Sequence, residues 1–415
     1  MHLEAYAGVA DLARELDPAE LEALERAGVP EPVPGATRGR RGRGVPGIPP
    51  APAAPPQARK GRGATVNPPN RFERQEAAPF DDGWETLAAE FAGLPPLPTT
   101  LTRDSSRSAI AWNQSPDIGF DRAVNPYRGC EHGCIYCYAR PSHAYLGYSP
   151  GLDFETRLVF KPDVAELLER ELRKPGYVAR TLALGSNTDP YQPVERTLKL
   201  TRAVLQVLDR FNHPVSIVTK SAGVLRDLDI LQSLASRGLV RVHLSVTTLD
   251  AALARVMEPR AATPARRLQA VEALARSGVP VAVLAAPMIP GLNDAELERI
   301  LEASARAGAG HAGYVLLRLP NELKTIFTAW LQERFPDRAA RVLDLIRETR
   351  AGALNDSTFG QRFSGSGAYA DMLARRFSRA TKQLGLQDRG ELDGSRFAVP
   401  ADVRQELAAA QMSLF

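Results

Sequence analysis

The sequence is poor in cysteine and holds no long apolar run. Only three of its 415 residues are cysteine, too few for the disulfide framework that staples small secreted domains. No stretch of about eighteen consecutive apolar residues occurs, which excludes a transmembrane helix. The N-terminus lacks a basic start, an apolar segment and a cleavage site, so we expect no signal peptide, no membrane attachment and a cytoplasmic location.

Charge is spread unevenly along the chain. Residues 29–75 carry nine Lys and Arg against two acidic residues, whereas residues 1–28 carry two Arg against seven acidic residues. The remainder is close to neutral, so the overall net charge of +4 does not indicate a basic face on the folded body. A basic stretch suits polyanionic partners, but a merely solvated linker explains it equally well.

The sequence pattern divides the chain into six parts. The segment 29–75 is rich in Pro, Gly and Arg and has too few apolar residues for a core, so we expect disorder there, above all over 29–70. Asp17 followed by Pro18 is a typical helix start and predicts a short helix over 18–27. The six parts are a short helical segment (1–28), a disordered linker (29–75), a lead-in segment (76–119), an α/β body (120–320), a helical extension (321–400) and a final helix with a tail (401–415).

From residue 120 onward, short β-rich runs alternate with amphipathic stretches. This alternation predicts an α/β fold whose parallel strands are joined by right-handed crossovers. No G-x-G-x-x-G follows the first strand, so we favour a closed or partly closed barrel, with its chemistry at the carboxyl ends of the strands. Thr263 before Pro264, and Asn293 followed by Glu296, predict two helix starts. The predicted strands are 120–127, 181–185, 214–219, 240–247, 279–286 and 313–318, and the predicted helices are 163–173, 194–210, 224–237, 264–277 and 294–307.

All three cysteines stand together directly after the first predicted strand, in NPYRGCEHGCIYCYAR. Cys130, Cys134 and Cys137 have the spacing C-x3-C-x2-C on one tight loop, which cannot form a disulfide set. A structural zinc site needs a fourth ligand, which His132 or His143 would supply. A 4Fe–4S cluster held by three thiolates instead keeps one iron open for a substrate or cofactor. Three unrelated buried thiols are the remaining interpretation.

The cysteine motif, with Tyr136 before its third cysteine, resembles that of the radical S-adenosylmethionine (radical SAM) superfamily. The resemblance implies a partial (βα)6 TIM-type barrel, a 4Fe–4S cluster and SAM as cofactors, and an electron donor such as flavodoxin or ferredoxin. In such enzymes the open iron binds SAM, and an electron from the cluster cleaves SAM to a 5′-deoxyadenosyl radical that abstracts a substrate hydrogen. Gly129 and Gly133 suit the tight loop that a cluster requires.

Within the superfamily, the stretches LGSNTDPYQPVE and VTKSAGVLRD resemble the spore-photoproduct-lyase-like branch, and more narrowly a bacterial family within it. The resemblance covers residues 60–390. It implies that the residues after the second strand contact the methionyl amine of SAM and that Lys220, after the third strand, contacts its carboxylate. A plain turn and a solvated lysine are the alternatives. The second-strand candidates are Ser186, Asn187, Thr188 and Asp189.

The other cofactor contacts that the resemblance implies come from three places. Ser245 and Thr247 share one face of the fourth strand, so both reach the ribose or neither does. Met288 ends the fifth strand and is the candidate for the adenine wall, although core packing would explain it as well. Tyr136, on the cysteine loop, completes the set.

The sequence departs from the photoproduct lyases in one respect. Some of those enzymes keep a cysteine on the second-strand loop as hydrogen donor, whereas this chain has no cysteine outside the motif. The donor would have to be regenerated SAM, solvent or a tyrosine such as Tyr191 or Tyr369, so no catalytic residue is named. With all three cysteines in the motif, none remains to bind an auxiliary cluster. This argues against the peptide-maturing enzymes and the methylthiotransferases of the superfamily.

Two stretches near the C-terminus bear on partners. The Gly-rich run that opens 359–379 precedes a basic helix and can cradle phosphate with Arg375, Arg376 and Arg379 nearby. A plain loop before a solvated helix is the alternative.

The last five residues resemble the bacterial sliding-clamp-binding pentapeptide, whose amide and two apolar side chains enter a pocket on the partner. A tail docked on its own core is the alternative. These residues are Gln411, Met412, Ser413, Leu414 and Phe415.

Together these patterns predict a radical SAM enzyme that acts on DNA, in repair or base modification, and is recruited by the sliding clamp. RNA modification, which the Arg/Gly-rich linker favours, is one alternative. A non-enzymatic clamp or nucleic-acid adaptor with a structural iron–sulfur cluster is another. A zinc-binding module is a third.

Overall fold

The computed structural model describes residues 61–72, 97–386 and 390–401. The expectations for the helix at 18–27, most of the linker, the final helix and the tail therefore lie outside the described residues. Within the described part, no helix is both long and apolar enough to cross a membrane.

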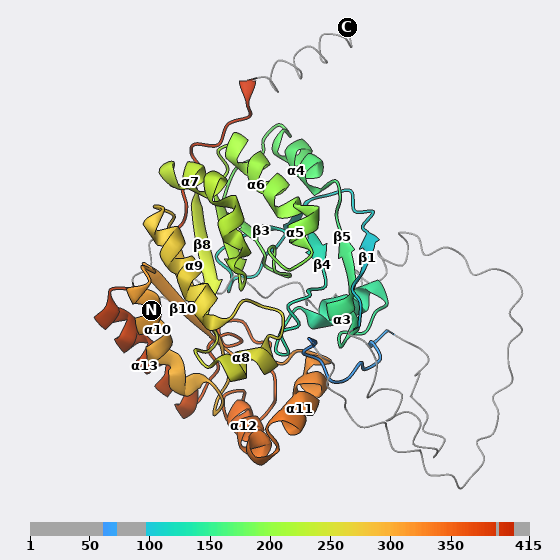
Figure 1. The fold of residues 1–415 in the computed structure, drawn as a ribbon, viewed down its shortest axis with the longest axis vertical. Helices are drawn as coiled ribbons and strands as arrows, with labels where there is room; N and C mark the ends of the chain where they lie inside the picture. Colours follow the sequence, from blue (N-terminus) through green and yellow to red (C-terminus); the bar gives the residue numbers. More distant parts are fainter. Residues whose placement is uncertain (1–60, 73–96, 387–389, 402–415) are drawn as a thin grey trace, which may run out of the picture. The chain divides into compact units, whose positions relative to one another are not determined.

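One seven-stranded sheet organises the fold (Figure 1). Its strands lie in the order β10-β9-β8-β7-β6-β3-β2, and all neighbours are parallel except the edge pair β2 and β3. The six parallel strands follow chain order, as successive βα units require. The prediction of an α/β fold with a parallel sheet is thus confirmed. The strands are β2 (Ile110–Trp112), β3 (Arg122–Val124), β6 (Leu182–Leu184), β7 (Val215–Thr219), β8 (Val240–Ser245), β9 (Val281–Met288) and β10 (His311–Leu316).

The first predicted strand, 120–127, is wrong as a single element. Asn125 and Pro126 interrupt it, because proline has no N–H for a ladder. The chain continues as β4 (Tyr127–Arg128) in a second sheet of order β1-β5-β4, with β1 (Thr100–Arg103) and β5 (Arg157–Phe160). Strand β4 of this small sheet therefore lies between β3 and the cysteines in the sequence.

The predicted helices of the body are present, but three of them are interrupted. The helix expected at 294–307 begins as a 3-10 turn over Asp294–Glu296. The helix expected at 194–210 is split by Lys199, whose φ of 54° lies in the left-handed region. The helix expected at 224–237 begins as a 3-10 turn. The helices of the body are η2 (Arg140–Leu146), α3 (Asp153–Thr156), α4 (Val164–Leu172), α5 (Glu195–Leu198), α6 (Leu200–Arg210), η3 (Ala222–Asp227), α7 (Leu228–Ser236), α8 (Ala251–Met257), α9 (Pro264–Arg276), η4 (Asp294–Glu296) and α10 (Leu297–Arg306).

The two predicted helix caps differ in outcome. Thr263 caps α9 as expected, since its side chain accepts from the backbone N–H of Arg266. Asn293 stands at the N-cap position of the 3-10 turn that begins at Asp294, so the predicted start is present, but its side chain makes no capping hydrogen bond. Its Oδ1 accepts from the N–H of Ile289 at 2.6 Å and its Nδ2 donates to the carbonyl of Thr247 at 2.8 Å. Because its amide is committed to these loops, Asn293 joins the ends of β8 and β9 instead.

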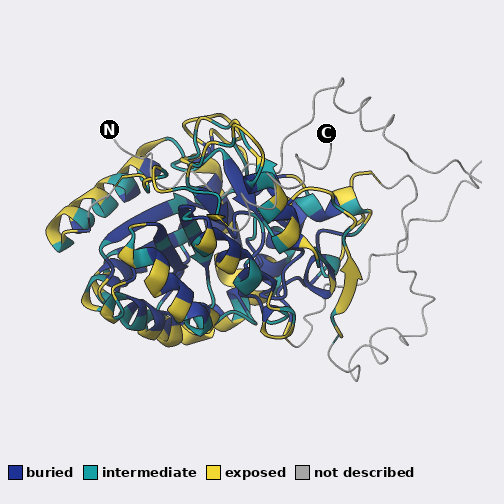
Figure 2. Cartoon of the chain, turned by 90° about the horizontal axis from the view of Figure 1, so that it is seen from above, coloured by how far each residue is buried: buried dark blue, intermediate teal, exposed yellow. Residues whose placement is uncertain are grey.

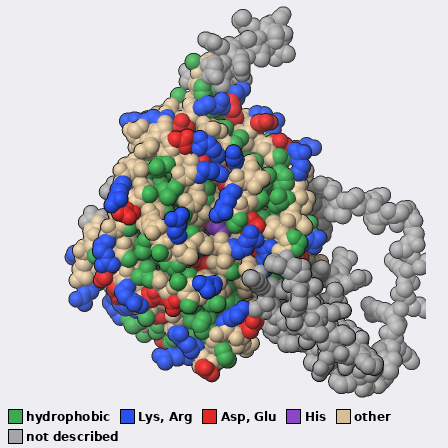
Figure 3. Space-filling view, in the orientation of Figure 1, with side chains coloured by type: hydrophobic (Ala, Val, Ile, Leu, Met, Phe, Trp, Pro, Cys, Tyr) green, Lys and Arg blue, Asp and Glu red, His purple; other side chains and the backbone are tan. Residues whose placement is uncertain are grey.

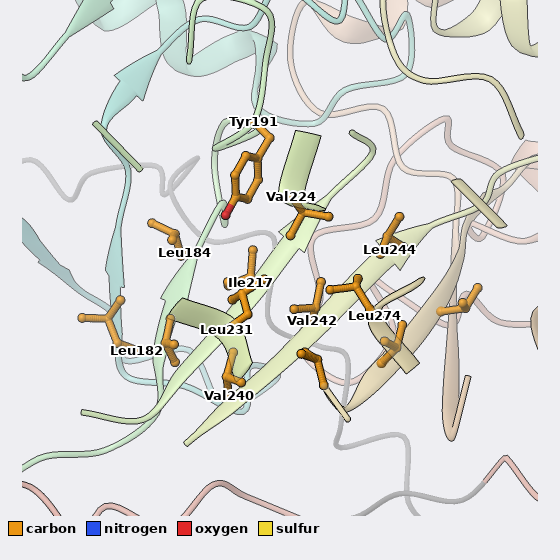
Figure 4. Close-up of a cluster of buried hydrophobic side chains, with 14 of the residues drawn as sticks. Leu182, Leu184, Tyr191, Ile217, Val224, Leu231, Val240, Val242, Leu244 and Leu274 are labelled. Carbon is orange, nitrogen blue, oxygen red and sulfur yellow. The ribbon is translucent and has the colours of Figure 1, made fainter. Parts of the chain in front are cut away.

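Apolar side chains form the main core between the sheet and its helices. The strand register aligns Leu182, Val215 and Val240 in one row across β6, β7 and β8. Figure 4 shows this face of the sheet, with Leu231 of α7 and Leu274 of α9 packed on it. The buried strands and the exposed outer faces of the helices are distinguished in Figure 2. This packing fixes the strand ends on which the site residues stand.

Residues 321–386 form the helical extension. Its helices are α11 (Leu323–Arg334), α12 (Pro336–Glu348) and α13 (Ala368–Leu384). A second apolar cluster joins α11 and α12 to the cysteine loop, since it contains Ile135 as well as Trp330 and Ile346. The extension therefore supports the loop that carries the cysteines.

Basic and acidic side chains are interspersed over the face of the described chain that Figure 3 shows. Several basic groups are also neutralised by close carboxylates, such as Arg202 by Asp229 and Arg376 by Glu298. This arrangement matches the near-neutral charge that the sequence gives residues 76–415.

Residues 61–72 correct the expectation of disorder for their part of the linker. Ala64 is fully buried, and the Arg62 guanidinium donates to the backbone carbonyls of Glu155 and Leu97. Farther on, Arg71 pairs with Glu322 at the start of α11. Composition misled here because arginines and backbone groups hold much of the segment, while only a few apolar side chains, such as Ala64 and Val66, join the apolar cluster beneath it. We call residues 61–72 the strap.

Candidate active site

The cysteine loop follows β4 and leads into η2. Cys130 and Cys134 are buried, and Cys137 is half-buried. Gly129 and Gly133 take positive φ angles of 78° and 67°, and a Cβ on either would strike neighbouring atoms. The tight loop that the sequence predicted around these glycines is therefore present.

A buried ion pair shapes the loop from within. The Arg140 guanidinium donates to the carbonyl of Cys134 at 2.9 Å and to the carboxylate of Glu155 at 2.5 Å. Two further donations reach the carbonyls of Pro150 and Gly151. The loop, the segment after η2 and helix α3 are thus fixed to one guanidinium.

The strap lies against the same loop. The Glu155 carboxylate accepts from the N–H groups of Gly63 at 2.9 Å and Ala64 at 2.8 Å. Gly63 approaches so closely that a Cβ there would lie 1.8 Å from the carbonyl oxygen of Gly133. Sequence reasoning missed these contacts, although a glycine such as Gly63 is a signal of a close backbone approach.

Gln192 ties the cysteine loop to the segment after β6. Its Oε1 accepts from the N–H of Glu131 at 2.9 Å, and its Nε2 donates to the carbonyl of Gly129 at 3.2 Å. The side chain is fully buried. No sequence signal distinguished this glutamine from the rest of the DPYQPVE stretch.

The buried thiols suit a metal cluster. Burial raises the pKa of the Cys134 thiol to about 12, although the nearby charge of Lys220 lowers it in part. Burial likewise raises the pKa values of Cys130 and Cys137. Thiolates are the form that binds metals, so iron would displace these protons and supply the compensating positive charge. Three such donors on one loop fit a cluster that keeps one iron open.

A single-ion zinc site is not formed in the described part of the chain, where no three His, Cys, Asp or Glu side chains are gathered for one metal. His132 lies with Nδ1 3.2 Å from Asp189. His143 packs edge-on against Phe154, and burial lowers its pKa to about 4. Neither histidine stands as a fourth ligand beside the thiols.

Asp189 joins three segments at the edge of the site. One carboxylate oxygen accepts from the N–H of Tyr191 and the hydroxyl of Thr219, and the other accepts from the N–H of Lys220 at 2.7 Å. Burial opposes its charge, but His132 and these donors outweigh burial and hold the pKa of Asp189 at about 2. The carboxylate is thus ionised and engaged by the protein itself.

The other second-strand candidates lie beside Asn125. Its Nδ2 donates to the hydroxyl of Ser186 at 3.1 Å, and its Oδ1 accepts from the N–H of Asn187 at 3.0 Å. The hydroxyl of Thr188 donates to the carbonyl of Tyr127 and is buried. Asn187 remains half-buried at the surface of this group. Sequence reasoning missed Asn125, which precedes the proline that ends β3.

Lys220, the candidate for the SAM carboxylate, lies beside the cysteine loop. Its Nζ lies 5.6 Å from the centre of the Tyr136 ring. Its charge also acts on the thiols of Cys134 and Cys137. Among the described residues, no hydrogen bond or ion pair engages this ammonium group.

Tyr136 and Thr247 meet at a buried acid that the sequence did not single out. Both hydroxyls contact Glu258, which also pairs with Arg267. Burial opposes ionisation of Glu258, but Arg267 and Lys220 outweigh it and hold the pKa of Glu258 at about 2. Glu258 thus connects the cysteine loop with the end of β8.

Ser245 and Met288 lie at the ends of their strands and are buried. The carbonyl of Ser245 accepts from Arg267. Met288 belongs to the main apolar core. Thr247 lies beyond the end of β8, so the shared-face argument does not extend to it.

Comparisons with known proteins identify the family to which the chain belongs. The model of the radical SAM superfamily matches residues 124–303. An uncharacterized protein of Mycobacterium tuberculosis is 37% identical over 297 residues, which span 67% of this chain and 85% of that protein. The chain belongs to the radical SAM superfamily of enzymes. An uncharacterized protein of Methanocaldococcus jannaschii is 29% identical over 178 residues, which span 43% of this chain and 64% of that protein.

Solved structures of spore photoproduct lyase share the fold of this radical SAM enzyme. A cysteine-to-serine variant aligns with a TM-score of 0.50 and 18% identity, over 69% of this chain and 79% of that one. The lyase complexed with dinucleoside spore photoproduct aligns with a TM-score of 0.50 and 17% identity, again over 69% of this chain and 79% of that one. The resemblance to the lyase branch that the motifs indicated is confirmed at the level of the fold.

Proposed function

We propose that Cys130, Cys134 and Cys137 hold a 4Fe–4S cluster and that SAM binds beside it, at the carboxyl ends of the strands of a partial (βα)6 barrel. The observation that carries this proposal is the buried three-cysteine loop with the ammonium of Lys220 turned toward it. When bound, cluster and SAM supply a 5′-deoxyadenosyl radical that abstracts hydrogen from the substrate. The electron comes from a donor such as flavodoxin or ferredoxin.

The residues around the loop divide into binding and positioning groups. Lys220 binds the SAM carboxylate, because among the described residues no hydrogen bond or ion pair engages its ammonium group. Asn187 and Ser186 face the methionyl amine, held in place by Asn125. Asp189 acts through its neighbours, because its carboxylate already fixes the backbone of Lys220.

The remaining candidates serve the nucleoside end of SAM. Tyr136 and Thr247 are held by Glu258, so they present an ordered wall rather than mobile hydroxyls. Ser245 contacts the ribose, and Met288 borders the adenine from the core side. Burial of most of the loop, including Cys130 and Cys134, keeps bulk water from the radical chemistry.

The proposed substrate is DNA, in repair or base modification. Fold similarity to a lyase complexed with dinucleoside spore photoproduct supports this choice, and so do the motifs of the lyase branch. A damaged base is a suitable target because its extrusion from the duplex costs less than that of a paired base.

The substrate proposal is tested with 5′-deoxyadenosine formation by the anaerobically reconstituted, dithionite-reduced protein. Ultraviolet-damaged DNA should stimulate formation over undamaged DNA and over an irradiated RNA of matched sequence. Stimulation by RNA alone would assign the enzyme to RNA modification. No stimulation by any nucleic acid would refute a nucleic-acid substrate.

Recruitment by the sliding clamp is proposed from the last five residues, 411–415. The terminal Leu414 and Phe415 would fill the apolar pocket of the partner, and Gln411 would supply the amide. Deleting these five residues should abolish clamp binding in a pull-down and in a titration with purified clamp. Unchanged clamp affinity of the truncated chain would refute recruitment through this tail.

A further inference from the structure

An alternating stack of aromatic rings and guanidinium groups leads away from the cysteine loop. The Arg318 guanidinium lies 5.8 Å from the ring centre of Tyr138, the neighbour of Cys137, and 5.3 Å from that of Phe363. The Arg362 guanidinium lies 4.9 Å from the ring centre of Phe363 and 4.7 Å from that of Phe359. All four distances are within the range of cation–π contacts.

The stack ends at an exposed ring. Phe359 is 57% exposed, whereas the Arg362 beneath it is buried. An exposed phenyl ring on a buried guanidinium presents one aromatic face to solvent. The ring is therefore a candidate docking point, connected by stacked side chains to the cysteine loop.

The loop that carries Phe359 is held rigidly. The buried Arg350 donates to the carbonyls of Gln361 and Arg362 and also to those of Leu316 and Leu317. On the other side, the N–H of Leu316 donates to the carbonyl of Phe363 at 2.8 Å. A ring on such a loop loses little freedom when a ligand stacks on it.

Part of the Gly-rich run that opens 359–379 is already engaged by the protein. The N–H of Gly360 donates to Asp117, and those of Gly365 and Ser366 donate to the carbonyls of Gln361 and Thr349. Asp117 also lies 2.8 Å from the Arg362 guanidinium. Because these three amides are engaged and Arg362 is neutralised by Asp117, the end of the loop around Phe359 is better suited to stack on a ring than to bind an anion.

We propose that Phe359 is a stacking platform for an unpaired nucleobase of a single-stranded or locally opened nucleic acid. Every base has an aromatic face, and stacking on phenylalanine or on a ring backed by arginine is a recurrent way of binding single strands. The proposal rests on the proposed nucleic-acid substrate. It adds that one unstacked base of this substrate lies on Phe359, at the outer end of the stack that begins at Tyr138.

The test uses the full-length reconstituted protein and a short single-stranded oligodeoxynucleotide that contains one 2-aminopurine. A matched RNA forms the second arm. Stacking quenches 2-aminopurine emission, so the signal reports the contact itself as well as affinity. Phe359→Leu keeps apolar volume and removes the aromatic face, whereas Phe359→Trp restores it. Melting temperature and iron content confirm that each variant is folded and loaded.

A matched control is Trp112→Leu. Trp112 is also exposed and stacks on a guanidinium, that of Arg122, at 4.7 Å. The other ring contact of Arg122 is with Tyr177, so this pair does not extend the stack that begins at Tyr138.

We expect Phe359→Leu to weaken binding about tenfold and to lose the quenching, since base stacking on an aromatic side chain has an effect of this order. Phe359→Trp should keep both signals, and Trp112→Leu should match the wild type. Wild-type affinity in Phe359→Leu, or an equal loss in Trp112→Leu, would overturn the platform while leaving the proposed substrate intact. A wild-type protein that binds neither oligonucleotide would overturn both. Tighter binding of the RNA would support the platform and contradict the DNA assignment.

Discussion

Arg140 and Glu155 form an ion pair with 2.5 Å between nitrogen and oxygen, and neither side chain is exposed. The pair joins segments that are far apart in the sequence. Arg140 holds the carbonyl of Cys134, while Glu155 holds the strap through Gly63 and Ala64. The conformation of the cysteine loop therefore depends on a charge pair outside the motif.

Replacing Glu155 by leucine should destabilise the protein strongly. The substitution leaves Arg140 charged in a buried site and frees two backbone N–H groups of the strap, and breaking a buried pair costs about 3–5 kcal/mol. Urea unfolding measures the loss. The control is Glu272→Leu, whose pair with Arg276 is exposed at the protein surface and contributes less than about 1 kcal/mol. Equal losses in the two variants would contradict the role of Glu155.

Gly63→Ala should separate the strap from the cysteine loop. The added methyl group would overlap the carbonyl of Gly133, and such overpacking costs about 1–3 kcal/mol. We expect lower iron content after reconstitution and faster proteolysis within 61–72. Gly61→Ala is the control, because it meets no atom within 4 Å and carries only the strain of its positive φ. The same iron content in both variants would argue against a strap that supports the loop.

Lys220→Gln should weaken SAM binding by about tenfold or more, because it removes a charge-assisted hydrogen bond to a carboxylate. Equilibrium dialysis of the anaerobic reconstituted protein measures the dissociation constant. Lys199→Gln removes an exposed lysine at the junction of α5 and α6 and should leave SAM affinity unchanged. Wild-type affinity in Lys220→Gln would exclude it as the carboxylate ligand.

Stability should fall in mild acid through His213. Burial lowers the pKa of His213 to about 4, whereas an unfolded histidine titrates near 6.5. The neutral ring thus contributes stability that is fully present above pH 6.5 and is lost as the pH falls toward 4. Between pH 6.5 and 5 the loss is about 1.5 kcal/mol.

Urea unfolding at these two pH values, in wild type and His213→Gln, measures this contribution. His143, which has a similarly lowered pKa, remains in both proteins, so the difference between them isolates His213. The variant should show a shallower pH dependence. An unchanged slope would mean that His213 is not buried in its neutral form.

The alternation of apolar runs located the six parallel strands because each lies in a sheet with helices packed on one face. The same pattern could not find β1, all four of whose residues are exposed, and it missed the break at Pro126. Short exposed strands have no periodicity to detect, and their pairing depends on partners elsewhere in the chain.

The cysteines and Lys220 were predictable because local spacing and strand ends indicate them. Glu258 was not, since it meets Tyr136 across 122 positions of sequence. The strap was misjudged for a related reason. Low apolar content predicts disorder, but it carries no information on a backbone held by one distant carboxylate.

The most direct test of the account is 5′-deoxyadenosine formation by the anaerobically reconstituted, dithionite-reduced wild type beside a Cys134→Ala variant. The account predicts product from the wild type and none above background from the variant, together with the loss of cluster absorbance in the variant. A fully loaded wild-type protein that forms no 5′-deoxyadenosine, with or without nucleic acid, would contradict the account and favour a non-enzymatic adaptor with a structural cluster.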